Sequence, residues 1–80
     1  MPVVFRTKGF RFFFYSNEGN PPEPVHIHVR KGSASAKFWI EPDAGVAHTY
    51  GFDPATLNEL VRIVENNAEL IERAWHEHFG

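Results

Sequence analysis

In the stretch Pro24-Val25-His26-Ile27-His28-Val29-Arg30, apolar and polar side chains alternate strictly from Val25 onward. Successive side chains of a β-strand point to opposite faces, so this period of two predicts a strand with one apolar face and one face that carries two histidines and an arginine. A strand face that only meets solvent is expected to carry Thr, Ser or Lys. Histidine and arginine in a row instead indicate chemistry or anion binding.

Segments rich in β-branched and aromatic residues surround this strand and are separated by short turns that contain glycine. Lys8-Gly9 and Lys31-Gly32 are typical of two-residue hairpin loops, so the strands that they join should pair antiparallel. The expected strands are Val3 to Thr7, Phe10 to Ser16, the histidine strand, Ala34 to Glu41 and a short edge strand from Val46 to Tyr50.

From Asp53 onward the apolar residues recur at steps of three and four, which predicts helix. Asp53 suits the N-cap and Pro54 the first helical position. One helix from Pro54 to His78 would be about 37 Å long at 1.5 Å per residue, so we expect a break near Asn66-Asn67. Asn66 followed by Glu69 resembles a capping box, which favours the start of a second helix there.

Length and composition predict one small soluble domain over residues 1–80. Eighty residues lie near the lower limit for a chain that folds alone. The absence of cysteine excludes disulfides and thiolate metal sites, so we expect a reducing compartment. No basic segment leads a long apolar run after Met1, and no stretch approaches the roughly 20 apolar residues of a membrane span. These features predict a cytoplasmic protein with an α+β fold, in which an antiparallel sheet of four or five strands carries the C-terminal helix, kinked or divided in two, on one face.

Charge is divided unevenly along the chain. Residues 1–40 carry six Lys and Arg against two Glu, and residues 41–80 carry two Arg against eight Asp and Glu. This asymmetry predicts a basic element for an anionic partner, together with an acidic element that is solvated or faces a basic protein. The alternative is that helices simply tolerate Glu better than strands do.

The two hairpins fix an expected register and therefore an expected pair of faces. The predicted pairs are Phe5 with Phe12, Val3 with Phe14, Arg6 with Arg11, Val4 with Phe13, Ile27 with Ala36, Val25 with Phe38, His28 with Ser35 and His26 with Lys37. The apolar face, which the helices should cover, collects Val3, Phe5, Phe10, Phe12, Phe14, Val25, Ile27, Val29, Phe38 and Ile40.

The other face combines cations with rings, and we call it the mixed face. Its members are Arg6, Arg11, Phe13, Tyr15, His26, His28, Arg30, Lys37 and Trp39. Cations interleaved with aromatic rings suit a single-stranded nucleic acid, because phosphates pair with Arg and Lys while bases stack on rings. Arg6 opposite Arg11 is unfavourable unless an anion lies between them. The alternative is that Phe13, Tyr15 and Trp39 form a second small core under the loop of residues 17–23, or a dimer seam.

The two histidines admit three interpretations. As exposed groups they suit general acid and base chemistry near neutral pH, and replacing both with alanine should then leave stability nearly unchanged. They also suit a shared metal ion, for which a third ligand would have to come from His48, Glu41 or Glu23. The third interpretation is a purely structural role. No metal ligand set and no cofactor is predicted from the spacing.

Several separated motifs resemble the small bacterial family called domain of unknown function 4160. They are the run from Phe12 to Asn20, His26-Ile27-His28-Val29, the run from Ala36 to Pro42, Gly51-Phe52 and the closing Ala74-Trp75-His76-Glu77. Members typically show Pro-Pro-His-x-His-Val, where this chain has Pro24-Val25 before the first histidine. The resemblance implies a neighbouring-gene protein partner, a role in a toxin–antitoxin module and an RNA target, and it supplies no catalytic residues.

The predicted function is therefore that of a toxin–antitoxin component that binds RNA on the mixed face, with His26 and His28 as candidates for RNA cleavage. A non-catalytic protein-interaction module and a small histidine-based metal-binding protein are the alternatives. The chain has twelve aromatic residues among Phe, Trp and Tyr, more than one small core readily hides. We therefore expect a homodimer or a complex with the neighbouring gene product, formed through the sheet face or the edge strand Val46 to Tyr50.

Overall fold

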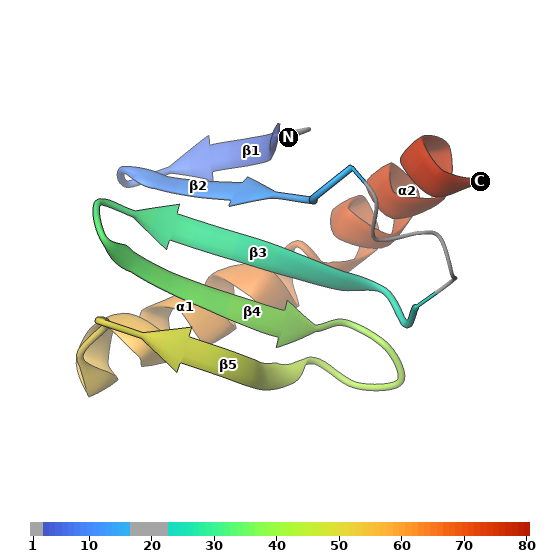
Figure 1. Ribbon diagram of the computed structural model, residues 1–80. Coiled ribbons are helices and arrows are strands. Elements are labelled where there is room, and N and C mark those ends of the chain that lie inside the picture. The colour runs from blue at the N-terminus through green and yellow to red at the C-terminus, as the bar shows by residue number, and fades with distance from the viewer. Residues whose placement is uncertain (1–2, 17–22) are drawn as a thin grey trace.

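The computed structural model, which describes residues 3–16 and 23–80, shows a five-stranded antiparallel sheet with two C-terminal helices on one face (Figure 1). The strands follow one another across the sheet in chain order. The elements are β1 Val3–Thr7, β2 Phe10–Phe13, β3 His26–Lys31, β4 Ala34–Trp39, β5 Gly45–Tyr50, α1 Pro54–Asn66 and α2 Ala68–Phe79. The α+β class and the expected edge strand are confirmed.

The first hairpin turns as predicted at Lys8-Gly9. Both residues have positive φ, 52° and 82°, which is the conformation that a tight type I′ turn requires and that glycine adopts without strain. Arg6 lies opposite Arg11 and Phe5 opposite Phe12, as expected.

A register shift between Val3 and Phe5 changes the far end of this hairpin. Val3 lies opposite Phe13, so the predicted pairs of Val3 with Phe14 and of Val4 with Phe13 are wrong. A bulge adds one residue to one strand, and every residue beyond it changes face. Val3 is therefore exposed, and Val4 packs against the core in its place.

The second hairpin turns one residue later than predicted. Lys31 pairs with Ala34, so the turn residues are Gly32 and Ser33 rather than Lys31 and Gly32. Every predicted pair of this hairpin is wrong by two positions, and His28 lies opposite Lys37 while His26 lies opposite Trp39. Because side chains alternate with a period of two, a shift of two leaves the two faces as predicted.

One hydrophobic core fills the space between the sheet and the helices. Leu60 and Val64 of α1 and Ile71 and Trp75 of α2 are buried against it. The sheet contributes Phe10, Phe12, Phe14, Val25, Ile27, Val29, Ala36, Phe38 and Ile40. Except for Val3, the predicted apolar face therefore meets the helices.

The helical segment breaks at the predicted position, between Asn66 and Ala68, but the predicted capping box is not formed. Asp53 caps α1 by accepting a hydrogen bond from the backbone N–H of Thr56 at 2.7 Å. Asn67 separates the helices, and its Nδ2 donates to the carbonyl of Ile63 at 2.7 Å, so its side chain points back toward α1. The predicted capping box from Asn66 to Glu69 is therefore wrong, because the residue that precedes α2 is Asn67 and its side chain makes no cap hydrogen bond.

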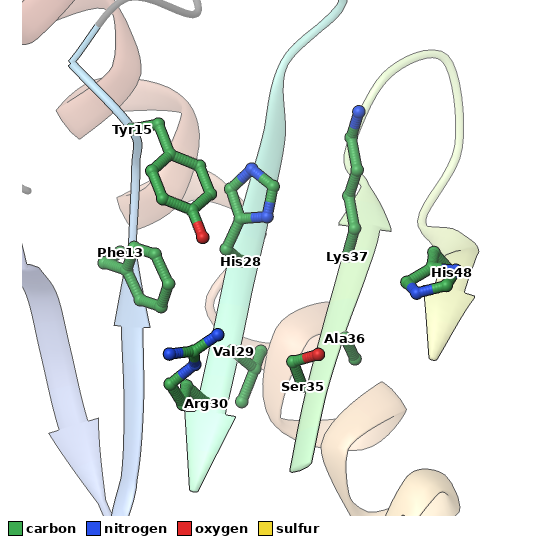
Figure 2. Close-up of a pocket in the computed structure, with 9 residues that line it drawn as sticks. All are labelled: Phe13, Tyr15, His28, Val29, Arg30, Ser35, Ala36, Lys37 and His48. Atoms are coloured by element: carbon green, nitrogen blue, oxygen red, sulfur yellow. The ribbon is translucent and has the colours of Figure 1, made fainter. Parts of the chain in front are cut away.

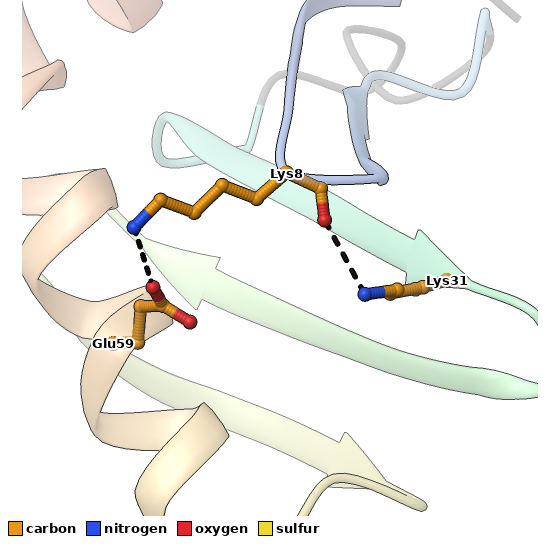
Figure 3. Close-up of polar contacts among 3 residues, drawn as sticks. All are labelled: Lys8, Lys31 and Glu59. Atoms are coloured by element: carbon orange, nitrogen blue, oxygen red, sulfur yellow. Dashed lines mark hydrogen bonds and ion pairs between the residues drawn. The ribbon is translucent and has the colours of Figure 1, made fainter.

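An ion pair ties the first hairpin to α1. The Nζ of Lys8 lies 2.7 Å from a carboxylate oxygen of Glu59, and the Nζ of Lys31 donates to the carbonyl of Lys8 at 3.3 Å (Figure 3). Lys8 thus connects three elements at the hairpin end of the sheet. The hydrogen bond and the charge of Lys8 lower the pKa of the Glu59 carboxyl, and hydrogen bonds from Thr56 lower the pKa of Asp53.

These two carboxylates predict an acid-dependent loss of stability. A folded-state pKa below the unfolded value stabilises the fold above the unfolded value, about 4, and this contribution disappears as the pH falls through the folded value. We expect the melting temperature to fall between pH 5 and pH 3, and the fall to be smaller in the double variant Asp53→Asn/Glu59→Gln. Thermal melts by circular dichroism over this range measure the effect. If the melting temperature changed equally with pH in both proteins, Asp53 and Glu59 would not be the source of the acid-dependent loss.

Candidate nucleic-acid interface

The mixed face is the sheet face opposite the helices, and the register arranges its side chains in rows that run across the strands. The first row, which we call the arginine row, contains Arg6, Arg11 and Arg30 from β1, β2 and β3. The second, the histidine row, contains Phe13, His28, Lys37 and His48 from β2, β3, β4 and β5. Neighbouring strands lie about 4.8 Å apart, so side chains within a row are close neighbours.

A hollow of about 260 Å³ opens on this face along the histidine row (Figure 2). Tyr15 stands on one side of it next to His28, and Lys37 and His48 stand on the other. Its lining consists of Phe13, Tyr15, His28, Val29, Arg30, Ser35, Ala36, Lys37 and His48. The hollow therefore combines two cations, two imidazoles and the aromatic ring of a tyrosine.

His28 lies inside a cluster of rings. Its ring centroid is 4.6 Å from that of Tyr15, 5.7 Å from that of Phe13 and 5.2 Å from that of His26. Phe13 is only 2% exposed, so its ring supports its neighbours and the surface left for base stacking is that of Tyr15 and Trp39. This cluster is similar to the second small core that the sequence offers as an alternative. The loop expected to cover it, residues 17–23, lies outside the described residues except for Glu23.

His26 is unlike His28, because it is completely buried. β2 stops pairing with β3 at Phe13, and the chain beyond it turns away (Figure 1). Near this point Trp75 of the helix layer contacts His26, with ring centroids 4.9 Å apart, while Trp39 lies 5.5 Å away. The Nδ1 of His26 lies 3.0 Å from the carbonyl of Pro24 and donates to it, since a carbonyl oxygen only accepts.

Two of the cations are held along the face by aromatic rings. The Nζ of Lys37 lies 4.5 Å from the ring centroid of Trp39, and the guanidinium carbon of Arg11 lies 5.6 Å from that of Phe13. Such cation–π contacts restrict long side chains without neutralising their charge. The cations therefore remain able to attract an anion.

The two layers of the molecule carry opposite charge. None of the five strands contains Asp or Glu, whereas they hold Arg6, Arg11, Arg30, Lys31 and Lys37. The helices hold five glutamates against two arginines, Arg62 and Arg73. The charge asymmetry along the sequence thus becomes an asymmetry between a basic sheet and an acidic helical layer.

His48 is the site residue whose place the sequence did not reveal. The sequence predicts for it only the role of a third metal ligand. Its position in the hollow depends on the pairing of β4 with β5, which places it opposite Lys37. Within residues 3–16 and 23–80, no three His, Asp or Glu side chains come together in an arrangement that could hold a metal ion. The two strand histidines are therefore not joined there by His48, Glu41 or Glu23.

Comparison with known proteins gives a family and nothing closer. Neither helix, over the part of the chain that the structure describes, is long and apolar enough to cross a membrane. No curated protein and no solved structure matches the chain. A family model matches residues 9–76. This range includes every residue of the histidine row, and Arg11 and Arg30 of the arginine row. The chain therefore belongs to the family described as Domain of unknown function (DUF4160).

Proposed function

We propose that the mixed face binds single-stranded RNA. The observation that carries the proposal is the composition of this face. The arginine row and the histidine row lie beside the exposed ring of Tyr15 and the partly exposed ring of Trp39, and none of the five strands contributes a carboxylate. A single strand offers phosphates to the cations and unstacked bases to the rings. An open sheet face without acidic groups in its strands suits both.

Each side chain has a definite role in this proposal. Arg6, Arg11, Arg30 and Lys37 hold phosphates, while Tyr15 and Trp39 stack on bases. His28 lines the hollow and is the histidine able to exchange protons with a bound strand. His26 is buried against His28 and Trp75, so its role is to position His28.

The setting that we propose for this activity is a toxin–antitoxin module, and its support is the resemblance described above. Induced expression of the chain alone in a bacterial host should arrest growth, and expression of the neighbouring gene product should relieve the arrest. Normal growth in both cultures would instead favour a binding module.

Fluorescence anisotropy with a labelled single-stranded RNA tests the binding proposal. Affinity should fall as salt rises, with a slope of about −0.7 in log K against log salt for each phosphate contacted. Tyr15→Ala should weaken binding by about 1–3 kcal/mol, or roughly 5- to 150-fold in Kd, because it removes a stacking surface. Lys37→Ala should make this slope less negative by about 0.7, because one phosphate contact is lost.

Arg73→Ala is the matched control for Lys37→Ala. Arg73 is an exposed cation of α2 on the opposite layer, so its loss changes the net charge equally and should leave RNA affinity nearly unchanged. Absence of binding at low salt would end the proposal, as would equal effects of the two substitutions.

The second candidate function is protein interaction through β5. This strand pairs only with β4 in the sheet, and Val46 and Tyr50 on it are 42% and 66% exposed. An unpaired edge with exposed apolar side chains suits strand addition by a second copy or by a partner chain. Light scattering at micromolar concentration measures this directly, since a dimer should become a monomer in the variant Val46→Lys.

A further inference from the structure

A second cavity lies at the hairpin end of the mixed face and is lined by four cations. Its volume is about 350 Å³, and its lining comprises the arginine row together with Lys31, Phe10 and the two turn glycines Gly9 and Gly32. The β1–β2 and β2–β3 pairings place Arg6 opposite Arg11 and Arg11 opposite Arg30. Three arginines from three adjacent strands therefore line one space.

Among residues 3–16 and 23–80, no acidic side chain lines this concentration of positive charge. The lining contains no Asp or Glu, and within the described ranges 3–16 and 23–80 the ion pair that the structure gives is that of Lys8 with Glu59. Like charges directly opposite each other on neighbouring strands destabilise a sheet. The arginine row is thus costly for the isolated protein, and a bound anion would offset that cost.

Within the described part of the chain, Arg11 is the residue of this cavity that lacks a hydrogen-bond acceptor. Its Nε is buried and finds no hydrogen-bond partner among the residues that the structure describes. A buried N–H without an acceptor is unfavourable, and a bound ion is one way in which native proteins satisfy such a group. The contact of its guanidinium with Phe13 keeps the side chain on the face, between Arg6 and Arg30.

We propose that this cavity binds a phosphomonoester, namely the terminal phosphate of a single-stranded RNA. A terminal phosphate carries a charge of about −1.5 to −2 and three acceptor oxygens, whereas an internal phosphodiester carries −1. Guanidinium groups match phosphate oxygens in bidentate geometry, so three of them favour the more highly charged group.

The position of Arg30 connects this site with the hollow. Arg30 lines both cavities, so a strand whose end is held by the arginine row would continue directly onto Tyr15 and His28. This inference rests on the proposed function, since it names which part of the RNA the face recognises. The experiment must therefore separate failure of the inference from failure of RNA binding.

The test compares three labelled strands of one sequence, one with hydroxyl groups at both ends, one with a 5′-phosphate and one with a 3′-phosphate. We expect one phosphorylated strand to bind at least tenfold more tightly than the unphosphorylated strand. Arg11→Gln should abolish this preference, and Arg6→Gln, at an exposed position, should reduce it if Arg11→Gln fails to fold. Lys37→Gln, in the histidine row, should weaken all three strands alike and preserve the ratio.

A second measurement, the melting temperature with inorganic phosphate or a mononucleotide, examines the cavity without a strand. Equal affinity for all three strands, lowered equally by Arg11→Gln, would overturn the inference and leave RNA binding intact. No binding of any strand, with an Arg11-dependent rise in melting temperature on adding phosphate, would overturn the proposed function and keep an anion site. A mononucleotide that binds as tightly as the phosphorylated strand would overturn the RNA terminus as the source of the phosphate.

Discussion

His26→Ala is expected to lower the melting temperature by roughly 10–25 °C, whereas His28→Ala should lower it by less than about 8 °C. His26 is fully buried, packs against Trp75 and Trp39, and donates a hydrogen bond to the carbonyl of Pro24. Its truncation leaves a cavity and an unsatisfied carbonyl, which together cost on the order of 2–4 kcal/mol. His28 is only half-buried, so its removal costs less.

The two variants also separate structure from activity. His28→Ala should abolish any RNA-directed chemistry in a protein that still melts cooperatively, while loss of activity in His26→Ala should follow the loss of fold. Circular dichroism melts and RNA assays on both variants provide the comparison. Equal and small changes in melting temperature would contradict a structural role for His26 that His28 does not share. They would instead support the prediction from the sequence that neither histidine contributes much to stability.

Trp75→Ala should remove a large share of the free energy of unfolding. Trp75 is 5% exposed, and its ring lies 4.3 Å from Phe79, 5.3 Å from Phe14 and 4.9 Å from His26 between centroids. Removing so large a buried side chain costs about 3–5 kcal/mol, against a total stability of roughly 4–12 kcal/mol for a domain of this length. The far-ultraviolet circular dichroism spectrum and urea unfolding measure the loss.

Trp39→Ala is the control for this substitution. Trp39 lies on the mixed face, is partly exposed and contacts Lys37 and His26, so its removal should cost much less stability and mainly weaken RNA binding. A Trp39→Ala variant as unstable as Trp75→Ala would show that the mixed face is a second core rather than a binding surface.

The fold could be predicted because its signals are local. The alternation from Val25 to Arg30, the glycine turns and the change to helical spacing after Asp53 each depend on a few adjacent residues. The second turn lies one residue later than predicted, but the faces of β3 and β4 are still as predicted. Moving the turn by one residue shifts the strand pairing by two residues, which leaves each side chain on the same face.

The details of the site could not be predicted because they depend on contacts between distant segments. Nothing near His26 in the sequence indicates that Trp75, forty-nine positions later, packs against it and buries it. The bulge that exposes Val3 follows from the pairing of two whole strands, and the place of His48 in the hollow follows from the pairing of β4 with β5. Such features are set by tertiary packing rather than by the pattern within one segment.

The separation of charge between the sheet and the helices gives the molecule an electric dipole across its thickness. In the field of a polyanion the protein rotates before contact, so that its strands approach first and its glutamates point away, and this orientation accelerates productive encounters. The molecule measures 34 × 23 × 20 Å, whereas the Debye length is about 10 Å at 0.1 M salt. Ionic strength should therefore control the association rate constant more strongly than the dissociation rate constant, because the oriented approach disappears once the field is screened over a distance shorter than the protein itself.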